Sequence, residues 1–306
     1  MFRMFKLLVL FFALAFAFSP EMKLKRVKEN IYMVRGVDGL PSLENRGFMS
    51  NAFAVLTKEG WVVIDALSTP SLSKEFVDNL WRVKKAPIKY AIITHYHPDH
   101  WYGAKTYKQL GAKIIAHYKL LEEYNSGEAV ISLEGAKQRF KGLFDDVELI
   151  PPDIVVKDSM ELKVGSEVFK LVALEPAHTN NDLLVYLPKS KVLFVGDLVS
   201  KNRIVFVGDR NASIGGWLRA LEVIKGFDAE VILAGHNEPL KKDSIEDTYR
   251  YLSYLRENIK RMKEEGKPLD DIKQALQNNP FSNYVMYREF HNANIFAVYN
   301  QLDLEE

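Results

Sequence analysis

The chain has 306 residues, with 41 basic and 40 acidic side chains and a net charge of +1, so no charge excess favours nucleic acid or an anionic membrane surface as partner. It has no cysteine, which excludes disulfides, thiolate zinc sites and cysteine nucleophiles. A hydrophobic share of 47% allows a substantial core in one large domain or two smaller ones.

Residues 1–19 are expected to form a secretory signal peptide. Arg3 and Lys6 precede a continuous apolar run over residues 7–18. That run is shorter than the roughly 20 apolar residues that a bilayer-spanning helix needs, but it suits the core of a signal peptide. A buried N-terminal helix and an uncleaved anchor are the alternatives. Cleavage would leave a periplasmic or secreted protein without stable membrane insertion.

The first half of the mature chain alternates strands and helices. Apolar and β-branched runs predict strands over residues 24–35, 51–56, 61–64, 88–93 and 113–116. Helical spacing of apolar residues predicts helices over residues 71–83, 101–110 and 119–124, and residues 127–146 are polar and expected to be helical in part.

The second half is strand-rich and ends in helices. Strands are expected over residues 154–156, 160–164, 168–174, 183–187, 192–195 and 231–234, with a helix over 217–224 between the last two. Beyond Pro239 the chain becomes charged, and helices are predicted over 243–265 and 269–277.

A weak internal repeat links the halves. A buried strand ends at Asp65 and, after a helix, another strand ends at His95; Asp197 and His236 are placed in the same way in the second half. Open α/β sheets carry their ligands at the carboxyl ends of strands. We therefore expect both Asp/His pairs at one edge of the fold.

The segment after the strand over 88–93 carries three imidazoles and one carboxylate: His95, His97, Asp99 and His100. These are ligands that suit zinc and related metals. His95 and His97 can face one ion and Asp99 and His100 a second. Three more candidates stand at strand ends or in loops, namely His178, Asp197 and His236. About six ligands hold two metals, and Asp197 is the best candidate to bridge them.

Other polar residues have weaker signals. Tyr96 and Trp101 flank the histidine loop, where they can line a substrate pocket or simply pack. Lys201 and Arg203 follow Asp197 closely and can bind a substrate carboxylate. The two remaining histidines are not expected to bind metal: His117 is placed at a loop tip and His291 on the surface.

The H-x-H-x-D-H loop, followed in order by His178, Asp197 and His236, resembles the signature of the metallo-β-lactamase superfamily. The resemblance runs from about Ile31 to Pro239. It implies an α/β fold, a four-layer αβ/βα sandwich of two similar halves over residues 24–240, with a helical C-terminal extension over 241–306 packed on it.

The resemblance also implies a ligand set. On the family's pattern the first ion is held by His95, His97 and His178, and the second by Asp99, His100 and His236. Asp197 bridges the two ions, and Asp65 supports the loop without binding metal. The implied cofactor is a pair of zinc ions, with iron or manganese as alternatives.

A dinuclear zinc site lowers the pKa of a bridging water from 15.7 towards about 7. The sequence therefore predicts a metal-dependent hydrolase in which this hydroxide attacks a carbonyl of a lactam, lactone, ester or thioester. Asp99 would orient the hydroxide and accept a proton, and Asn211 would help to stabilise the oxyanion. The partner is a small-molecule substrate; the oligomeric state is left open.

The zinc β-lactamases of the closest pattern carry a cysteine where this chain has Asp197, so the chain departs from them. Three alternatives accompany the hypothesis of a zinc hydrolase. A glyoxalase II-like hydroxyacyl thioesterase fits the aspartate, and a non-haem iron enzyme similar to persulfide dioxygenases fits the same ligand set. A non-enzymatic binding module is the third; the complete set of seven candidate ligands argues against it.

Overall fold

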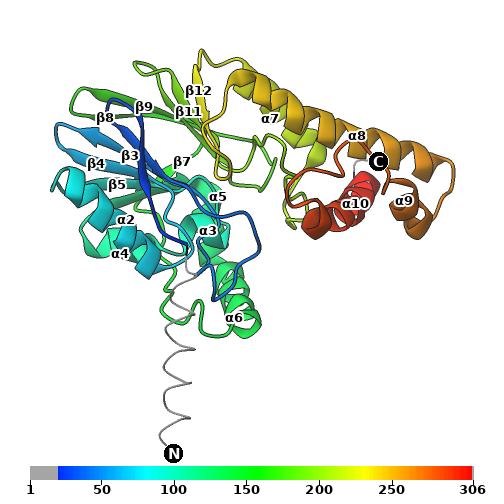
Figure 1. The fold of residues 1–306 in the computed structure, drawn as a ribbon, viewed down its shortest axis with the longest axis horizontal. Helices are drawn as coiled ribbons and strands as arrows, with labels where there is room; N and C mark the ends of the chain where they lie inside the picture. Colours follow the sequence, from blue (N-terminus) through cyan, green and yellow to red (C-terminus); the bar gives the residue numbers. More distant parts are fainter. Residues whose placement is uncertain (1–19, 305–306) are drawn as a thin grey trace, which may run out of the picture.

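A computed structural model describes residues 20–304 of the chain (Figure 1). The expected signal peptide, residues 1–19, lies outside the described residues. The described strands form two sheets, with strand orders β1-β2-β3-β4-β5-β6-β7 and β12-β11-β10-β9-β8. Each sheet combines antiparallel and parallel pairs, because β4 to β7 are parallel in the first and β11 and β12 are parallel in the second.

The strands are short, and those of the first sheet lie side by side in chain order. They are β1 Leu24–Lys28, β2 Ile31–Val34, β3 Ala52–Thr57, β4 Gly60–Ile64, β5 Ile88–Ile92, β6 Lys113–His117 and β7 Ile154–Val156. The second sheet contains β8 Ser159–Val164, β9 Glu167–Ala173, β10 Leu183–Leu187, β11 Val192–Phe194 and β12 Val231–Leu233.

Helices cover the outer face of each sheet. Those packed on the first sheet are α2 Pro70–Val83, α3 Pro98–Trp101, α4 Ala104–Gln109, α5 Tyr118–Asn125 and α6 Glu128–Arg139. The second sheet is covered by α7 Ile214–Lys225 and by the C-terminal helices.

The alternation of side chains along β4 shows how the layers form. Trp61 and Val63 are buried against the helices of the first half, whereas Val62 and Ile64 are buried against the second sheet. Successive side chains of a strand point to opposite faces, so a strand that is apolar throughout must be covered on both sides. The result is helices, sheet, sheet, helices, and the predicted four-layer αβ/βα sandwich is confirmed.

The repeat seen in the sequence is present in the structure. In the first half β4 and β5 are parallel and are joined through α2, and in the second β11 and β12 are parallel and are joined through α7. Both helices begin with a hydroxyl cap, because Thr69 and Ser213 each accept a hydrogen bond from a backbone N–H of the first turn. The strand ends that carry the Asp/His pairs therefore meet at one edge.

The C-terminal helices extend the outer layer of the second half (Figure 1). They are the short 3₁₀ helix η1 Lys242–Ser244, then α8 Ile245–Glu264, α9 Leu269–Ala275 and α10 Tyr287–Leu304. Buried Asn294 of α10 accepts a hydrogen bond from Val207 N at 2.8 Å and donates one to Val205 O at 2.7 Å. In this way α10 holds a loop that leads to the candidate site.

Two predicted elements differ from the structure, and one helix was not predicted separately. The single strand expected over residues 24–35 is wrong: Glu29 and Asn30 form a turn, and β1 and β2 pair as an antiparallel hairpin. The helix expected over 101–110 begins at Pro98 and is interrupted at Gly103, which has Ala66 O within 1.9 Å of the place a Cβ would occupy. The helical extension expected over residues 241–306 includes α10, but no separate helix was predicted there, because its apolar residues lie on several sides of the helix.

The prediction for His291 is also wrong. It was expected on the surface, but it is buried between the C-terminal helices. One ring nitrogen lies 3.0 Å from Leu276 O and the other 3.1 Å from the Tyr251 hydroxyl. A buried imidazole with both nitrogens hydrogen-bonded is stable there without a metal.

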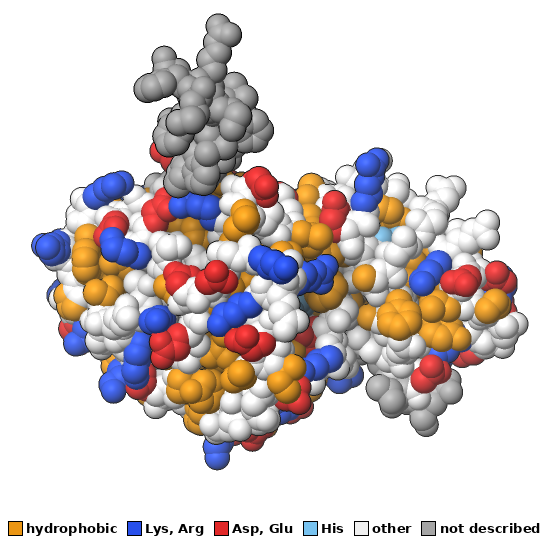
Figure 2. Space-filling view, turned by 90° about the horizontal axis from the view of Figure 1, so that it is seen from below, with side chains coloured by type: hydrophobic (Ala, Val, Ile, Leu, Met, Phe, Trp, Pro, Cys, Tyr) orange, Lys and Arg blue, Asp and Glu red, His pale blue; other side chains and the backbone are white. Residues whose placement is uncertain are grey.

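Acidic and basic side chains are interspersed on the face drawn in Figure 2. This face therefore has no large patch of one charge sign that would create a strong electrostatic potential. Within residues 20–304, no helix is both long enough and apolar enough to cross a bilayer.

Candidate metal centre

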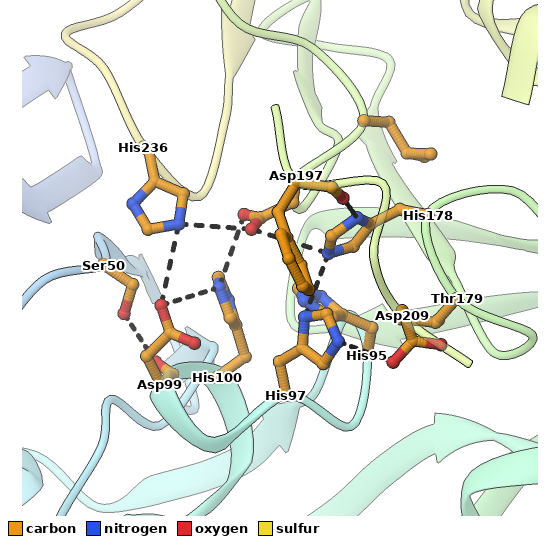
Figure 3. A network of polar contacts seen from close by, with 12 residues as sticks. Ser50, His95, His97, Asp99, His100, His178, Thr179, Asp197, Asp209 and His236 are labelled. Carbon is orange, nitrogen blue, oxygen red and sulfur yellow. Dashed lines mark hydrogen bonds and ion pairs between the residues drawn. The ribbon is translucent and has the colours of Figure 1, made fainter. Parts of the chain in front are cut away.

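The histidine loop begins where β5 ends and runs into α3. His95, Asp99 and His100 are buried, although each carries a polar or charged group. Figure 3 shows their side chains directed toward His178, Asp197 and His236, which arrive from the second half. The edge where the two halves meet therefore gathers all seven of the candidate ligands.

These side chains form two groups. His95, His97, His178 and Asp197 offer ligand atoms that all lie within 4.8 Å of one another, and so do Asp99, His100 and His236. Asp197 lies between the groups. Its carboxylate oxygens are 3.6 Å from His178 Nε2, 3.3 Å from His100 Nε2 and 3.1 Å from His236 Nε2. Asp197 is therefore close to histidines of both groups.

Three atoms at the centre of the cluster have no hydrogen-bond partner among the described residues. They are His95 Nε2, His100 Nε2 and Asp197 Oδ1, and all three are buried. His100 Nε2 and Asp197 Oδ1 are 3.3 Å apart, but their geometry is not that of a hydrogen bond. A buried unpaired donor or acceptor is costly, and metal coordination would satisfy all three atoms. The residues present therefore fit bound metal.

The outer nitrogen of each imidazole is held by a neighbour, which leaves the inner nitrogen directed at the cluster. His100 Nδ1 lies 2.8 Å from Asp65 Oδ2, and His236 Nδ1 lies 2.8 Å from Met49 O. His178 Nδ1 lies 3.1 Å from Phe206 O. Metal-binding histidines are oriented in this way in proteins, since the second nitrogen fixes the ring and its tautomer.

Asp65, which directly follows β4, contacts the histidine loop. Besides its contact to His100, it accepts hydrogen bonds from Thr94 N at 2.8 Å and from Thr94 Oγ1 at 3.0 Å. Its φ of 64° lies in the left-handed region, which a non-glycine residue adopts only where surrounding contacts compensate. Asp65 thus ties the end of β4 to the first residue of the loop.

Burial sets the protonation of two of the histidines. Desolvation lowers the pKa of His95 well below its usual value, and it lowers the pKa of His178 to about 3. Both imidazoles are therefore neutral at pH 7, which is the form that coordinates a metal.

Asp209 is a functional candidate that the sequence reasoning missed. Its side chain is 7% exposed and lies 2.9 Å from His97 Nε2. It also accepts a hydrogen bond from the Tyr96 hydroxyl at 2.5 Å and one from Asn211 N at 2.8 Å. Burial raises its pKa, but the contact with His97, together with the hydrogen bonds from Tyr96 and Asn211, outweighs this and lowers the pKa to about 2. An aspartate in a loop, 112 residues from His97, carries no spacing signal that could have identified it.

We expect Asp209→Asn to weaken metal binding by about 10- to 100-fold, because an amide replaces the charged acceptor that orients His97. Titration of the apoprotein with zinc against a chelating dye would measure this. The matched control is Asp228→Asn, since Asp228 is exposed and its carboxylate lies 3.0 Å from the surface Lys191 ammonium. Equal zinc affinity in Asp209→Asn and the wild type would contradict this role.

A cavity of about 520 Å³ opens beside the cluster. His97, Asp99, His178, Asp197 and His236 all line it, so the candidate metal ligands face the space that a substrate would enter. Much of the remaining wall is apolar: Leu40, Pro41, Met49, Phe140, Val199, Val205, Phe206, Phe290 and Ala293. A cavity of this size and lining is typical of small-molecule sites.

Of the residues suggested for substrate contact, Arg203 lines this cavity, whereas Lys201, Asn211, Tyr96 and Trp101 lie elsewhere. The Lys201 ammonium faces Asp243 at 3.6 Å, and the Asn211 side chain contacts the Tyr96 hydroxyl at 3.4 Å. Tyr96 and Trp101 line a second, smaller cavity of about 300 Å³ that shares His97 with the first. The indole of Trp101 is buried and donates to Ile150 O at 2.8 Å. The structure thus brings none of the four to the wall of the larger cavity.

Comparison with known proteins agrees with this geometry. The family model of the metallo-β-lactamase superfamily matches residues 45–236. The type 2 metallo-β-lactamase of Elizabethkingia meningoseptica is 25% identical over 79% of this chain and 89% of its own length. The linear primary-alkylsulfatase of a Pseudomonas strain is 21% identical over 76% of this chain and 51% of its own.

Two solved structures share the fold to different extents. The sec-alkylsulfatase Pisa1 from Pseudomonas sp. superposes with a TM-score of 0.75 and 18% identity, covering 92% of this chain and 50% of its own. The metallo-β-lactamase from Pontibacter korlensis has a TM-score of 0.59 and 18% identity, covering 76% of this chain and 99% of its own. This chain spans about half the length of the alkylsulfatases it matches. With the family model spanning more than half of its residues, the chain belongs to the metallo-β-lactamase superfamily.

Proposed function

We propose that the protein is a dinuclear metal-dependent hydrolase that cleaves a carbonyl compound, namely a lactam, lactone, ester or thioester. The observation that supports this most directly is a set of three buried atoms without a hydrogen-bond partner among the described residues, namely His95 Nε2, His100 Nε2 and Asp197 Oδ1. Asp197 lines the cavity of about 520 Å³ that opens beside them. Bound zinc ions would lower the pKa of a coordinated water towards about 7 and polarise the bond under attack.

In this proposal the residues of the chain would bind the metal ions, orient the attacking water and exclude bulk solvent. One ion would be held by His95, His97 and His178, the other by Asp99, His100 and His236, with Asp197 common to both. Asp99 lines the cavity, and its Oδ2 is 3.5 Å from His100 Nε2 and 3.6 Å from His236 Nε2. There it would orient the attacking water and accept its proton. The apolar wall would keep bulk water from the reacting atoms.

Hydrolysis of an alkyl sulfate ester is a second candidate. The alkylsulfatase match covers 92% of this chain, so at most 8% is unmatched, which is less than the C-terminal segment of residues 241–306. The β-lactamase match covers only 76%. The fold that this chain shares with an alkylsulfatase thus extends into the C-terminal helices, and α10 contributes Phe290 and Ala293 to the apolar cavity wall.

Metal analysis of the purified full-length chain, followed by a substrate panel, tests these functions. We expect about two zinc ions per chain, and activity that is lost with a chelator and restored by zinc. One iron per chain would overturn the hydrolase in favour of oxygenase chemistry. The substrate panel then distinguishes four activities. Nitrocefin tests for β-lactamase, a lactone for lactonase, S-lactoylglutathione for glyoxalase II-like and octyl sulfate for sulfatase activity. Failure to cleave any carbonyl substrate, with octyl sulfate cleaved, would favour the second candidate.

A further inference from the structure

The second cavity, of about 300 Å³, adjoins the larger one at the metal cluster. Three residues line both cavities, namely His97, Pro98 and Phe206, so they form the border between the two spaces. The Phe206 ring is held there, because its centre lies 5.2 Å from that of Phe290 and its Cζ would be 2.6 Å from a Cβ at Gly208. Since His97 is a candidate metal ligand, a bond cleaved at the cluster has one cavity on each side.

Aromatic rings and small residues line the second cavity. The rings belong to Tyr96, Trp101, Tyr102 and Phe206, and the small residues are Ala129 and Ser132 of α6 together with Gly208. The Tyr102 ring packs edge-on against Phe144 with their centres 5.7 Å apart, so this part of the wall is fixed. An apolar cavity of about 150 Å³ holds a benzene molecule, and aromatic rings pack favourably on one another. The second cavity therefore has room for an aromatic group of two rings.

The charges around this cavity are already paired. Arg210 is the one lysine or arginine that the described part of the chain places in its wall. Its Nη1 lies 2.6 Å from Glu128 Oε2, and its Nη2 contacts the Glu123 carboxylate. Asp209, which also lines the cavity, contacts His97. An anionic ligand would thus approach the carboxylates of Asp209 and Glu123 without gaining an unpaired cation, so the wall favours a neutral group.

The same ion pairs join the two halves of the fold beside the cavity. Glu123 belongs to α5 and Glu128 to α6, whereas Arg210 belongs to the segment between β11 and α7. The Glu123 side chain is only 9% exposed, so its pair with Arg210 is shielded from solvent. The second cavity is therefore built from both halves, as the candidate metal centre is, and walls held in this way need little rearrangement to bind a ligand.

We propose that the second cavity binds a neutral aromatic group of the substrate, of up to two rings, while the rest of the substrate lies in the larger cavity. This inference rests on the proposed function and deepens it by naming the substrate class: a compound with an arm on each side of its labile bond, one of them aromatic. Ala129 and Ser132 then determine specificity, because a larger side chain at either position would occupy the space of the rings.

Three esters test the proposal on the zinc-loaded full-length protein. In 2-naphthyl octanoate and octyl 2-naphthoate the rings lie on opposite sides of the ester bond, and methyl octanoate lacks them. We expect Ser132→Phe to lower kcat/KM for at least one naphthyl ester by about 10-fold or more, since the added ring competes for the cavity. For methyl octanoate we expect a change of less than about threefold. Ala129→Met should act in the same way, because it adds volume at a buried position of the wall.

Gln138→Phe is the matched control, since Gln138 is an exposed residue of the same helix that does not line the cavity. A loss confined to the naphthyl esters in either variant supports the proposal and identifies the side of the bond that carries the rings. Unchanged kinetics for both naphthyl esters in both variants, or equal losses for all three esters, would overturn it.

If the wild type cleaves none of the three esters, the proposed carbonyl chemistry fails separately, and binding decides. Calorimetric titration with 2-naphthol and with octanol measures it. Weaker binding of 2-naphthol in Ser132→Phe or Ala129→Met, with octanol unchanged, supports the aromatic site. No binding of 2-naphthol to the wild type, equal binding in all three proteins, or equal weakening of both ligands overturns it.

Discussion

Replacing Asp99 by alanine is expected to lower kcat by at least about 10³-fold, because one change removes both a metal ligand and the group that would orient the nucleophile and take its proton. Metal content should fall from about two ions per chain to about one. Turnover of whichever substrate the panel identifies, together with elemental analysis of the same sample, measures both effects.

The fold should survive this change. Ser50 Oγ donates to the backbone oxygen of Asp99 at 2.5 Å, and that contact does not depend on the carboxylate. Near-ultraviolet circular dichroism would show whether the packing is kept, and Asp145→Ala, at an exposed position, is the matched control. Should Asp99→Ala retain wild-type turnover, the role assigned to Asp99 is wrong.

The second large effect is expected at Gly235. A Cβ there would lie 2.2 Å from Asp197 Oδ1 and 2.6 Å from His100 Cε1. The backbone cannot retreat, since Gly235 N donates to Gly196 O at 2.7 Å and Asn51 N donates to Gly235 O at 2.6 Å. The side chain of Asp197 must therefore move away from the cluster. We expect Gly235→Ala to reduce zinc affinity by at least about 100-fold, as misplacing a ligand common to both ions should exceed the loss of an orienting group.

Gly135→Ala separates this steric effect from a general effect of removing a glycine. Gly135 lies within α6, and a Cβ there meets nothing within 4 Å. That variant should bind zinc normally and gain roughly 0.5–1 kcal/mol of stability, because alanine is the better helix former. Chelator competition measures the zinc affinity of both proteins, and thermal unfolding measures their stability. Wild-type affinity in Gly235→Ala would mean that the cluster tolerates a displaced Asp197.

Asp209 and Arg203 extend the site beyond its ligands. Asp209 lies on the far side of His97 from the cluster, and Arg203 lies along the cavity wall. Both belong to the segment between β11 and α7, which α10 supports through Asn294. This segment and the helix behind it therefore form part of the surroundings of the candidate metal ligands.

Local pattern was sufficient for much of the fold. The apolar run of β4 and the helical spacing of apolar residues in α2 are both short-range patterns. The backbone geometry of a strand or a helix sets such periodicity, so the sequence alone predicts the element. The loop from His95 to His100 could also be identified from the sequence, because histidine and aspartate at such close spacing have few roles other than metal binding. The order of strand, helix and strand in each half then predicted that the ligands would meet at one edge.

Only the tertiary structure decided what surrounds those ligands. Asp209 contacts His97 across 112 residues of chain, and Asn294 contacts Val207 across 87. Lys201 and Arg203 are two residues apart and equally basic, yet one faces Asp243 at the surface and the other is nearly buried in the cavity wall. Residue types and spacing were enough to predict a metal site, because a metal selects its ligands by their donor atoms. The shape and charge of the substrate cavity arise from contacts between distant segments, which local sequence does not encode.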